Sequence, residues 1–275
     1  MSWNIEGFSR NFQSLRHYTE VYQPILIFIS EPMLHNADLP PLLLPFLGEY
    51  DSHLNSEDCH DPNLPLESAR AHGGTMIMWC TSLTPYITVL PSKSPGFQTV
   101  LVKIPALVPS LHTALYLPTA GKEHEFTSML VELEAHIEEL RSTFPGAPHF
   151  IRGDANSNPN NISRSNLFTH FYTSLLFTRI PLHHPTYHHF MGNGCFDSEI
   201  DVLLVHGSDV SESVSNIVCK LDSPLVDSHH DIILSNCSIP RIQPSPPQEC
   251  LVSAPRISNS RMKIVWSEEG IDAYE

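Results

Sequence analysis

Several short apolar runs in this sequence have, at or just beyond one end, a side chain that can move a proton, bind an ion or hydrogen-bond a ligand. These residues are Asn4, Glu31, Tyr116, Asp154, Asn156, Asp201 and His230. Taken singly they say little, because a carboxylate after a strand is usually a solvated turn residue and Asp-Ala-Asn is typical of a turn. Taken together they predict a polar site, because open sheets hold their ligands just beyond strand ends.

A long amphipathic helix over residues 122–144 is the clearest of the elements that must position these side chains. Its apolar residues recur at helical spacing: Phe126, Met129, Leu130, Leu133, Ile137 and Leu140. The strand-like run HTALYL precedes the helix, and Pro145-Gly146 and the run HFIRGD follow it. Such a strand–helix–strand crossover would place Tyr116 and Asp154 at the same ends of two neighbouring strands.

Two further helices are predicted. The first covers about residues 12–22, from the spacing of Phe12, Leu15, Tyr18 and Tyr22. The second covers about 163–177 and would turn five apolar side chains inward: Leu167, Phe168, Phe171, Leu175 and Leu176.

Strands are predicted at 25–30, 200–205 and 231–237, and the runs TMIMWC, YITVL and FQTVLVKI indicate an antiparallel part of a sheet. The Pro-, Asn- and Asp-rich region 36–70 indicates a long surface loop. Beyond Pro240 the composition becomes rich in Pro and Ser, which is typical of a linker. We therefore expect one folded domain over 1–238 and, over 239–275, a linker with the start of a following segment.

The net negative charge of the chain disfavours a protein that binds nucleic acid through a basic surface. The chain has 15 basic and 30 acidic residues, for a net charge of −15, whereas DNA-binding domains usually carry a basic surface. This balance lowers the expected non-specific affinity for DNA, although a divalent cation can bridge an acidic site to phosphate. Six scattered cysteines without a CxxC pair, and no long apolar run, favour a reduced intracellular protein that does not cross a membrane.

Seven short motifs occur in a characteristic order along the chain. They are WNIEG at 3–7, SE at 30–31, YLPT at 116–119, GDAN at 153–156, PTY at 185–187, SEIDVLL at 198–204 and SHHDII at 228–233. The series resembles that of the endonuclease/exonuclease/phosphatase superfamily, and within it the apurinic-endonuclease-like endonuclease domains of LINE-type (non-LTR) retrotransposons. The resemblance implies an α/β fold, a four-layer αββα sandwich of two mixed sheets flanked by helices, as in deoxyribonuclease I.

The resemblance also implies an activity, the nicking of DNA to leave a 3′-hydroxyl. Glu31, with Asn4 and Glu6, would hold Mg²⁺, with Mn²⁺ as the alternative ion. Asp154 would activate water, Asn156 and Tyr116 would hydrogen-bond the phosphate, and Asp201 would orient His230 toward it. Thr186 and Ser198 would contact substrate or support the residues that do. DNA is the implied partner, together with a reverse transcriptase domain that is not in this sequence, and the nucleus is the implied compartment.

The motif series departs from the family at one position. Where the family reads Ser-Asp-His, this chain reads Ser228-His229-His230. Either His229 replaces the acidic residue as a ligand to phosphate or metal, or the site is weakened. Two other functions therefore stay open: a phosphomonoesterase or small-substrate phosphodiesterase of the same superfamily, and a retrotransposon remnant that folds without catalysis.

A zinc site is a weaker alternative. The pairs His183-His184 and His188-His189 supply imidazoles, but no cysteine stands at the spacing of a zinc finger.

Overall fold

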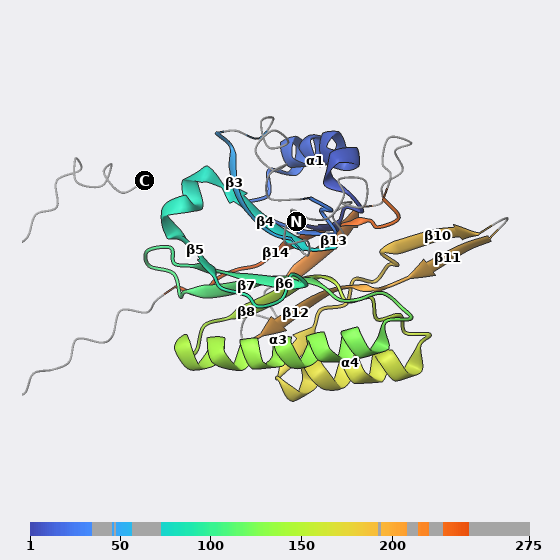
Figure 1. The fold of residues 1–275 in the computed structure, drawn as a ribbon. Helices are drawn as coiled ribbons and strands as arrows, with labels where there is room; N and C mark the ends of the chain where they lie inside the picture. Colours follow the sequence, from blue (N-terminus) through green and yellow to red (C-terminus); the bar gives the residue numbers. More distant parts are fainter. Residues whose placement is uncertain are drawn as a thin grey trace, which may run out of the picture. The chain divides into compact units, whose positions relative to one another are not determined.

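Two six-stranded sheets form the body of the chain in a computed structural model, which describes residues 1–34, 46, 48–56, 73–191, 194–207, 214–219 and 228–241. The first sheet has the order β13 (Ser215–Cys219), β14 (Ile232–Asn236), β1 (Ser2–Asn4), β2 (Leu26–Ser30), β4 (Thr75–Cys80) and β3 (Tyr50–Asn55). The second has the order β5 (Ile87–Leu90), β6 (Phe97–Val102), β7 (Ser110–Tyr116), β8 (His149–Asp154), β12 (Asp201–His206) and β9 (Phe177–Arg179). Strands β10 (Tyr187–Met191) and β11 (Gly194–Ser198) form a separate ribbon that projects from the body (Figure 1).

Helices cover the outer faces of both sheets (Figure 1). Helix α1 (Phe8–Tyr22) packs on the first sheet through Phe8 and Leu15, and helices α3 (Glu123–Thr143) and α4 (Ile162–Ser174) pack on the second. Between the sheets, Phe28 and Trp79 of the first meet Val100 and other apolar residues of the second. Because successive strand residues point to opposite faces, each central strand places some side chains between the two sheets and the others under the helices. The predicted four-layer αββα sandwich of two mixed sheets is therefore confirmed.

Each sheet contains one parallel pair of strands among those described, and both pairs end at the site. In the first sheet Asn4 of β1 is paired with Ser30 of β2, and in the second Tyr116 of β7 is paired with Asp154 of β8. Helix α1 joins the first pair and α3 joins the second, as the predicted crossover over 122–144 requires. The Ser30 hydroxyl donates to the carbonyl of Leu115 at 2.9 Å and ties the two sheets together at this edge.

The helix predicted over about residues 163–177 is shorter in the structure. Helix α4 ends at Ser174, and Phe177 begins the edge strand β9. The buried face of α4 is formed by Arg164, Phe168 and Phe171, so Leu167 lies outside it and is 38% exposed, and Leu176, in the turn to β9, is 74% exposed. The inward positions predicted for these two leucines are wrong.

The three apolar runs between residues 75 and 104 do not lie in one sheet. The chain leaves the first sheet after β4, passes through the 3₁₀ helix η3 (Thr81–Tyr86), and enters the second sheet at β5. The predicted loop over 36–70 contains the edge strand β3, and most of that range lies outside the described residues. Edge strands can be short and polar, as YDSHLN is, because one side faces solvent.

One compact unit spans Met1–Ile242. The predicted boundary at residue 238 stays a prediction, and the segment from 242 lies outside the described residues. None of the helices in the described part of the chain is long and apolar enough to cross a membrane.

Candidate active site

Asp154, at the end of β8, lies at the centre of a polar cluster where the two sheets meet. Its side chain is 1% exposed. One carboxylate oxygen, Oδ2, accepts a hydrogen bond from the Asn4 amide at 2.9 Å, and Oδ1 accepts one from the backbone N–H of Asn156 at 2.7 Å. Two sheets and a turn thus hold this carboxylate in one orientation.

His230 and Asp201 form the second part of the cluster. The Nδ1 of His230 lies 2.9 Å from Oδ2 of Asp201, at the start of β12, so Nδ1 carries a proton and Nε2 points to Asp154 at 3.8 Å. Asp201 faces Asp154 directly in the β8–β12 register. Trp3 donates to the carbonyl of His230 at 3.0 Å, which attaches this loop to β1.

Burial and the charges of neighbouring groups shift the pKa values of Asp154 and His230. Burial raises the pKa of Asp154 to about 7; the charge of His230 opposes this increase, and the negative charges of Asp201 and Glu31 add to it. Burial alone would lower the pKa of His230, but the Asp201 carboxylate outweighs it, and with Asp154 and Glu6 raises that pKa to about 9. His230 is therefore a cation at neutral pH, next to a carboxylate that readily takes up a proton.

Glu31 and Glu6 lie beside Asp154 and His230, and both have left-handed backbone conformations, with φ values of 50° and 45°. The backbone of Glu31 is fixed by hydrogen bonds to Gly7 and Gly74, at 2.9 and 3.1 Å. The carboxylate of Glu6 is occupied by His229, whose backbone N–H donates to it at 2.6 Å and whose Nδ1 lies 3.0 Å from the same oxygen. The residue that breaks the family pattern is thus paired with one of the predicted metal ligands.

The remaining predicted residues take supporting positions. Asn156, at φ 48°, donates its side-chain amide to the carbonyl of Leu117 at 2.8 Å. Tyr116 is half-buried at the end of β7. Thr186 is 0% exposed, and its hydroxyl accepts from the backbone N–H of Asp201 at 3.4 Å. The Ser198 hydroxyl is buried and has no hydrogen-bond partner in the described part of the chain. Their contacts with substrate stay predictions.

Tyr187 also lies in the site, although it was not among the predicted site residues. Its ring lies 4.8 Å from the ring of His230, and burial together with the negative charges of Glu6, Asp154 and Glu31 raises its pKa. Its phenol is therefore a proton donor that faces the carboxylate cluster. The PTY motif was the signal, since it places Tyr187 directly after Thr186.

The histidine pairs do not form the zinc site considered above. Both ring nitrogens of His188 are committed to carboxylates, Nδ1 to Asp197 at 2.8 Å and Nε2 to Asp231 at 2.9 Å. An imidazole that makes two such hydrogen bonds has no free lone pair for a metal.

The side chains of Glu31 and Asn4 supply oxygen atoms, the ligand type that a hard divalent cation prefers. Among the described residues, no group of three His, Cys, Asp or Glu side chains is placed to enclose an ion. The Glu31 carboxylate accepts no hydrogen bond from the described residues, and the Asn4 amide oxygen lies nearby, already accepting from the Glu6 N–H at 3.1 Å. One carboxylate, one amide oxygen and water is the kind of partial ligand set that Mg²⁺ uses.

No protein-family model matches the sequence, and none of the curated proteins matches it. Solved structures do match. The endonuclease domain of TRAS1, a telomere-specific non-LTR retrotransposon, is 13% identical with a TM-score of 0.62, over 86% of this chain and 96% of that one. The 3′ phosphatase NExo from Neisseria, bound to a product DNA hairpin, is 11% identical with a TM-score of 0.63, over 87% and 98%.

An AP endonuclease from Leishmania major is 12% identical, with a TM-score of 0.65, over 88% of this chain and 87% of that one. At such identities the likeness concerns the fold. The chain therefore has the fold of the endonuclease/exonuclease/phosphatase superfamily, to which all of these structures belong.

Proposed function

We propose that this chain is a Mg²⁺-dependent phosphodiesterase that nicks DNA and leaves a 3′-hydroxyl. The observation that carries the proposal is the array Asp201–His230–Asp154–Asn4, in which every polar side chain is buried, oriented by a hydrogen bond and gathered at one sheet edge. Buried groups with strongly shifted pKa values are typical of catalytic sites.

His230 would bind the scissile phosphate. Its Nδ1–H is held by Asp201, so its Nε2–H is the donor left for a phosphate oxygen, and its charge opposes the negative charge that builds there. Tyr187, which packs against the His230 ring, would donate a second hydrogen bond.

Asp154 would orient and deprotonate the attacking water, since its carboxylate pKa of about 7 suits a general base near neutral pH. Asp154 would take up the water proton as a bond forms between the water oxygen and phosphorus and the bond to the 3′-oxygen breaks, and the leaving oxygen would take up a proton from solvent to become the 3′-hydroxyl. Mg²⁺ held by Glu31 and Asn4 would polarise the phosphate and stabilise the leaving oxygen. A 3′-hydroxyl made in this way could prime the reverse transcriptase that the resemblance implies as a partner.

Nicking of supercoiled plasmid in MgCl₂ and in EDTA tests the proposal. Asp154→Asn and His230→Ala should each lower the rate roughly 100- to 10,000-fold, the range that one acid–base or electrostatic group supplies. Asp51→Asn, on the distant edge strand β3, is the matched control and should nick like the wild type. Nicking in EDTA, or rates within threefold of wild type for both site variants, would refute the assignment.

A phosphomonoesterase is the second candidate, and two observations favour it. One of the similar structures is a 3′ phosphatase that aligns over 98% of its length, and the net charge of −15 disfavours a long DNA contact. A duplex oligonucleotide with a 3′-phosphate separates the candidates. Release of inorganic phosphate without strand cleavage would favour the phosphatase over the endonuclease.

The third candidate, a remnant without catalysis, is favoured by His229. Its imidazole occupies the Glu6 carboxylate that the resemblance assigns to the metal. A folded protein that neither nicks plasmid nor releases phosphate at any Mg²⁺ concentration would support this candidate.

A further inference from the structure

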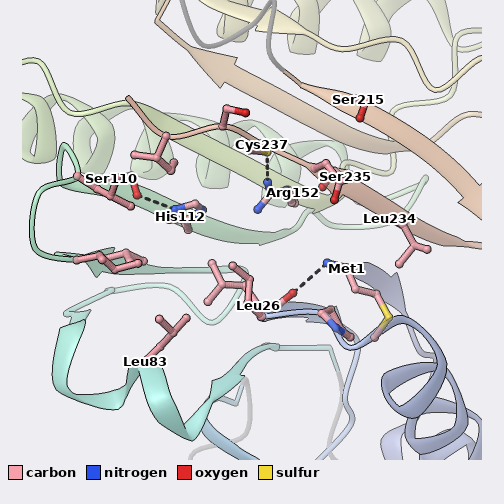
Figure 2. A pocket seen from close by; sticks show the side chains of 18 of the residues that line it. Met1, Leu26, Leu83, Ser110, His112, Arg152, Ser215, Leu234, Ser235 and Cys237 are labelled. Atoms are coloured by element: carbon pink, nitrogen blue, oxygen red, sulfur yellow. Dashed lines mark hydrogen bonds between the residues drawn. The ribbon is translucent and has the colours of Figure 1, made fainter. Parts of the chain in front are cut away.

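A cavity of about 620 Å³ opens at the edge of the sandwich opposite the candidate active site. It is lined by the start of β2 at Leu26 and the start of β7 at Ser110, whereas the far ends of these strands lead to Glu31 and Tyr116. Figure 2 shows Arg152 between His112 of β7 and Cys237, which follows β14, with Leu26 and Leu83 across the opening. A cavity of this size suits a small organic molecule.

Arg152 is a buried cationic residue in the lining of this cavity. It is 5% exposed, and no carboxylate of a described residue pairs with it. Its only hydrogen bond to a described residue runs from Nη2 to the Cys237 sulfur at 3.0 Å, and its buried Nε has no partner there. A buried charge is costly unless it is paired, so a guanidinium that lines a cavity without an acidic partner lacks an anion.

The surroundings hold the guanidinium in place without neutralising it. Arg152 stacks over the rings of Phe28 and Phe150, at 4.9 and 5.4 Å from their centres. These contacts restrict the side chain without using its N–H groups, and the hydrogen bond to Cys237 uses only Nη2, so further N–H groups of the guanidinium remain for a ligand. Two adjacent N–H groups of arginine match the two oxygens of a carboxylate or phosphate.

His112 adds a neutral polar group beside Arg152. Its Nε2 lies 2.9 Å from the Ser110 hydroxyl, and its Nδ1 is buried with no partner in the described part of the chain. Burial, followed by the charge of Arg152, keeps the pKa of His112 well below its usual range. Among the described residues that line the cavity, Arg152 therefore supplies the one cationic side chain, and His112 supplies a hydrogen-bonding side chain next to it.

The rest of the lining is mostly apolar. Leu26, Leu83, Val102, Ile104, Leu107 and Leu234 face the cavity. A ligand that pairs with Arg152 and also covers the apolar wall must combine an anionic head with an apolar body. A free inorganic anion would leave the apolar wall in contact with water, and a neutral hydrocarbon would leave Arg152 unpaired.

We propose that this cavity is a binding site for a small amphipathic organic anion, with its carboxylate or phosphate group on Arg152 and its hydrocarbon body against the apolar wall. This site is separate from the proposed catalytic cluster, and the inference does not depend on the proposed function.

Isothermal titration with octanoate, octyl phosphate and octanol tests the proposal and separates the two head groups. At least one of the two anions should bind the wild type at least tenfold more tightly than octanol. Arg152→Met should remove that preference, while Arg16→Met, on the exposed face of α1, should keep it. Equal binding of octanol and both anions, or unchanged anion binding by Arg152→Met, would overturn the proposal.

A second variant covers the case in which Arg152→Met does not fold. Leu83→Trp keeps the guanidinium and fills the cavity from its half-buried wall in η3. It should retain the wild-type circular dichroism and lose binding of the anion at least tenfold. Unchanged anion binding by this variant would place the ligand elsewhere and overturn the proposal. Asp154→Asn should bind the anion as the wild type does, whether or not the chain is a nuclease.

Discussion

His229 and Glu6 are joined by two hydrogen bonds that meet on one carboxylate oxygen. The backbone N–H of His229 donates to Oε2 of Glu6 at 2.6 Å, and Nδ1 of the ring lies 3.0 Å from the same atom. Where the family resembled by this chain has an acidic residue, this chain has an imidazole that supplies Glu6 with a partner. The Glu6 carboxylate therefore already has a partner, whereas the Glu31 carboxylate accepts no hydrogen bond from the described residues.

Glu31→Gln should weaken Mg²⁺ binding at least tenfold while the fold persists, because it removes one negative oxygen and conserves the shape of the side chain. The measurement is the rise in melting temperature as MgCl₂ is added, which does not depend on activity. Glu132→Gln, exposed on α3, is the matched control. An unchanged response to Mg²⁺ in Glu31→Gln would remove Glu31 from the metal site.

Asp201→Asn should lower the pKa of His230 from about 9, because the Asp201 carboxylate is the largest influence that raises it. Nuclear magnetic resonance titration of the ring would measure this change, and the nicking rate should fall roughly 100-fold or more with the loss of the cation. Asp197→Asn, which removes a carboxylate from His188 instead, should leave the titration of His230 unchanged. A His230 pKa that stayed near 9 in Asp201→Asn would contradict this account of the pair.

The residues that meet at the sheet edge could be predicted because they lie at or next to the ends of strands, most of which have a strong apolar pattern. The crossover through the helix at 122–144 placed Tyr116 and Asp154 on adjacent parallel strands, and the structure pairs them directly. By contrast, β9 has three residues, and β10 and β11 read YHHFM and GCFDS, which have little apolar alternation. These elements are stabilised by their neighbours rather than by local pattern, so sequence periodicity could not identify them.

The contacts within the site were harder to predict than its members. The partners Glu6 and His229 are 223 positions apart, and Asn4 and Asp154 are 150 apart. Motif order can imply that such residues share a cleft, but which donor meets which oxygen depends on the turns at Glu6, Glu31 and Asn156. All three adopt left-handed backbone conformations, which are common for Asn but which the residue type does not predict for the two Glu residues.

Gly153→Ala should destabilise the protein by roughly 3 kcal/mol or more, as expected for a clash at a special backbone position. Gly153 has a φ of 140°, and an added Cβ would lie 2.0 Å from the carbonyl oxygen of Leu115 on the neighbouring strand. Gly146→Ala is the control, because it shares a positive φ of 78° but meets no atom within 4 Å, and should cost about 1 kcal/mol. Urea unfolding measures both, and equal costs would mean that β7 and β8 are farther apart than described.

His149→Gln should make the protein less sensitive to acid. Burial, with the positive charge of Arg141 next, lowers the pKa of His149 from 6.5 to about 3 in the folded state. The unfolded chain therefore binds a proton that the folded chain does not, and stability that is complete above pH 6.5 is lost as the pH falls toward 3. By linkage the loss is about 1.4 kcal/mol at pH 5.5.

Urea unfolding at pH 7.5 and 5.5 checks the prediction for His149. The wild type should lose more stability between the two pH values than His149→Gln does, while His17→Gln, exposed on α1, should behave as the wild type. An identical pH dependence in the wild type and His149→Gln would show that the imidazole is charged in the folded protein.

His229→Asp should make both stability and nicking more dependent on Mg²⁺. The backbone N–H of residue 229 would still reach Glu6, but a second carboxylate would replace the imidazole, and two like charges at this distance repel unless a cation lies between them. The melting temperature should therefore fall in EDTA and rise further with MgCl₂ than in the wild type, and nicking should increase tenfold or more. His229→Asn, which removes the imidazole without adding a charge, should show neither effect.

In an Asp154→Ala background the response of the melting temperature should persist and the gain in nicking should vanish, because restoring one member of a catalytic unit does not rescue the loss of another. Reduced nicking by a folded His229→Asp would instead identify the imidazole as a functional ligand, adapted to a site that no longer uses the acidic residue.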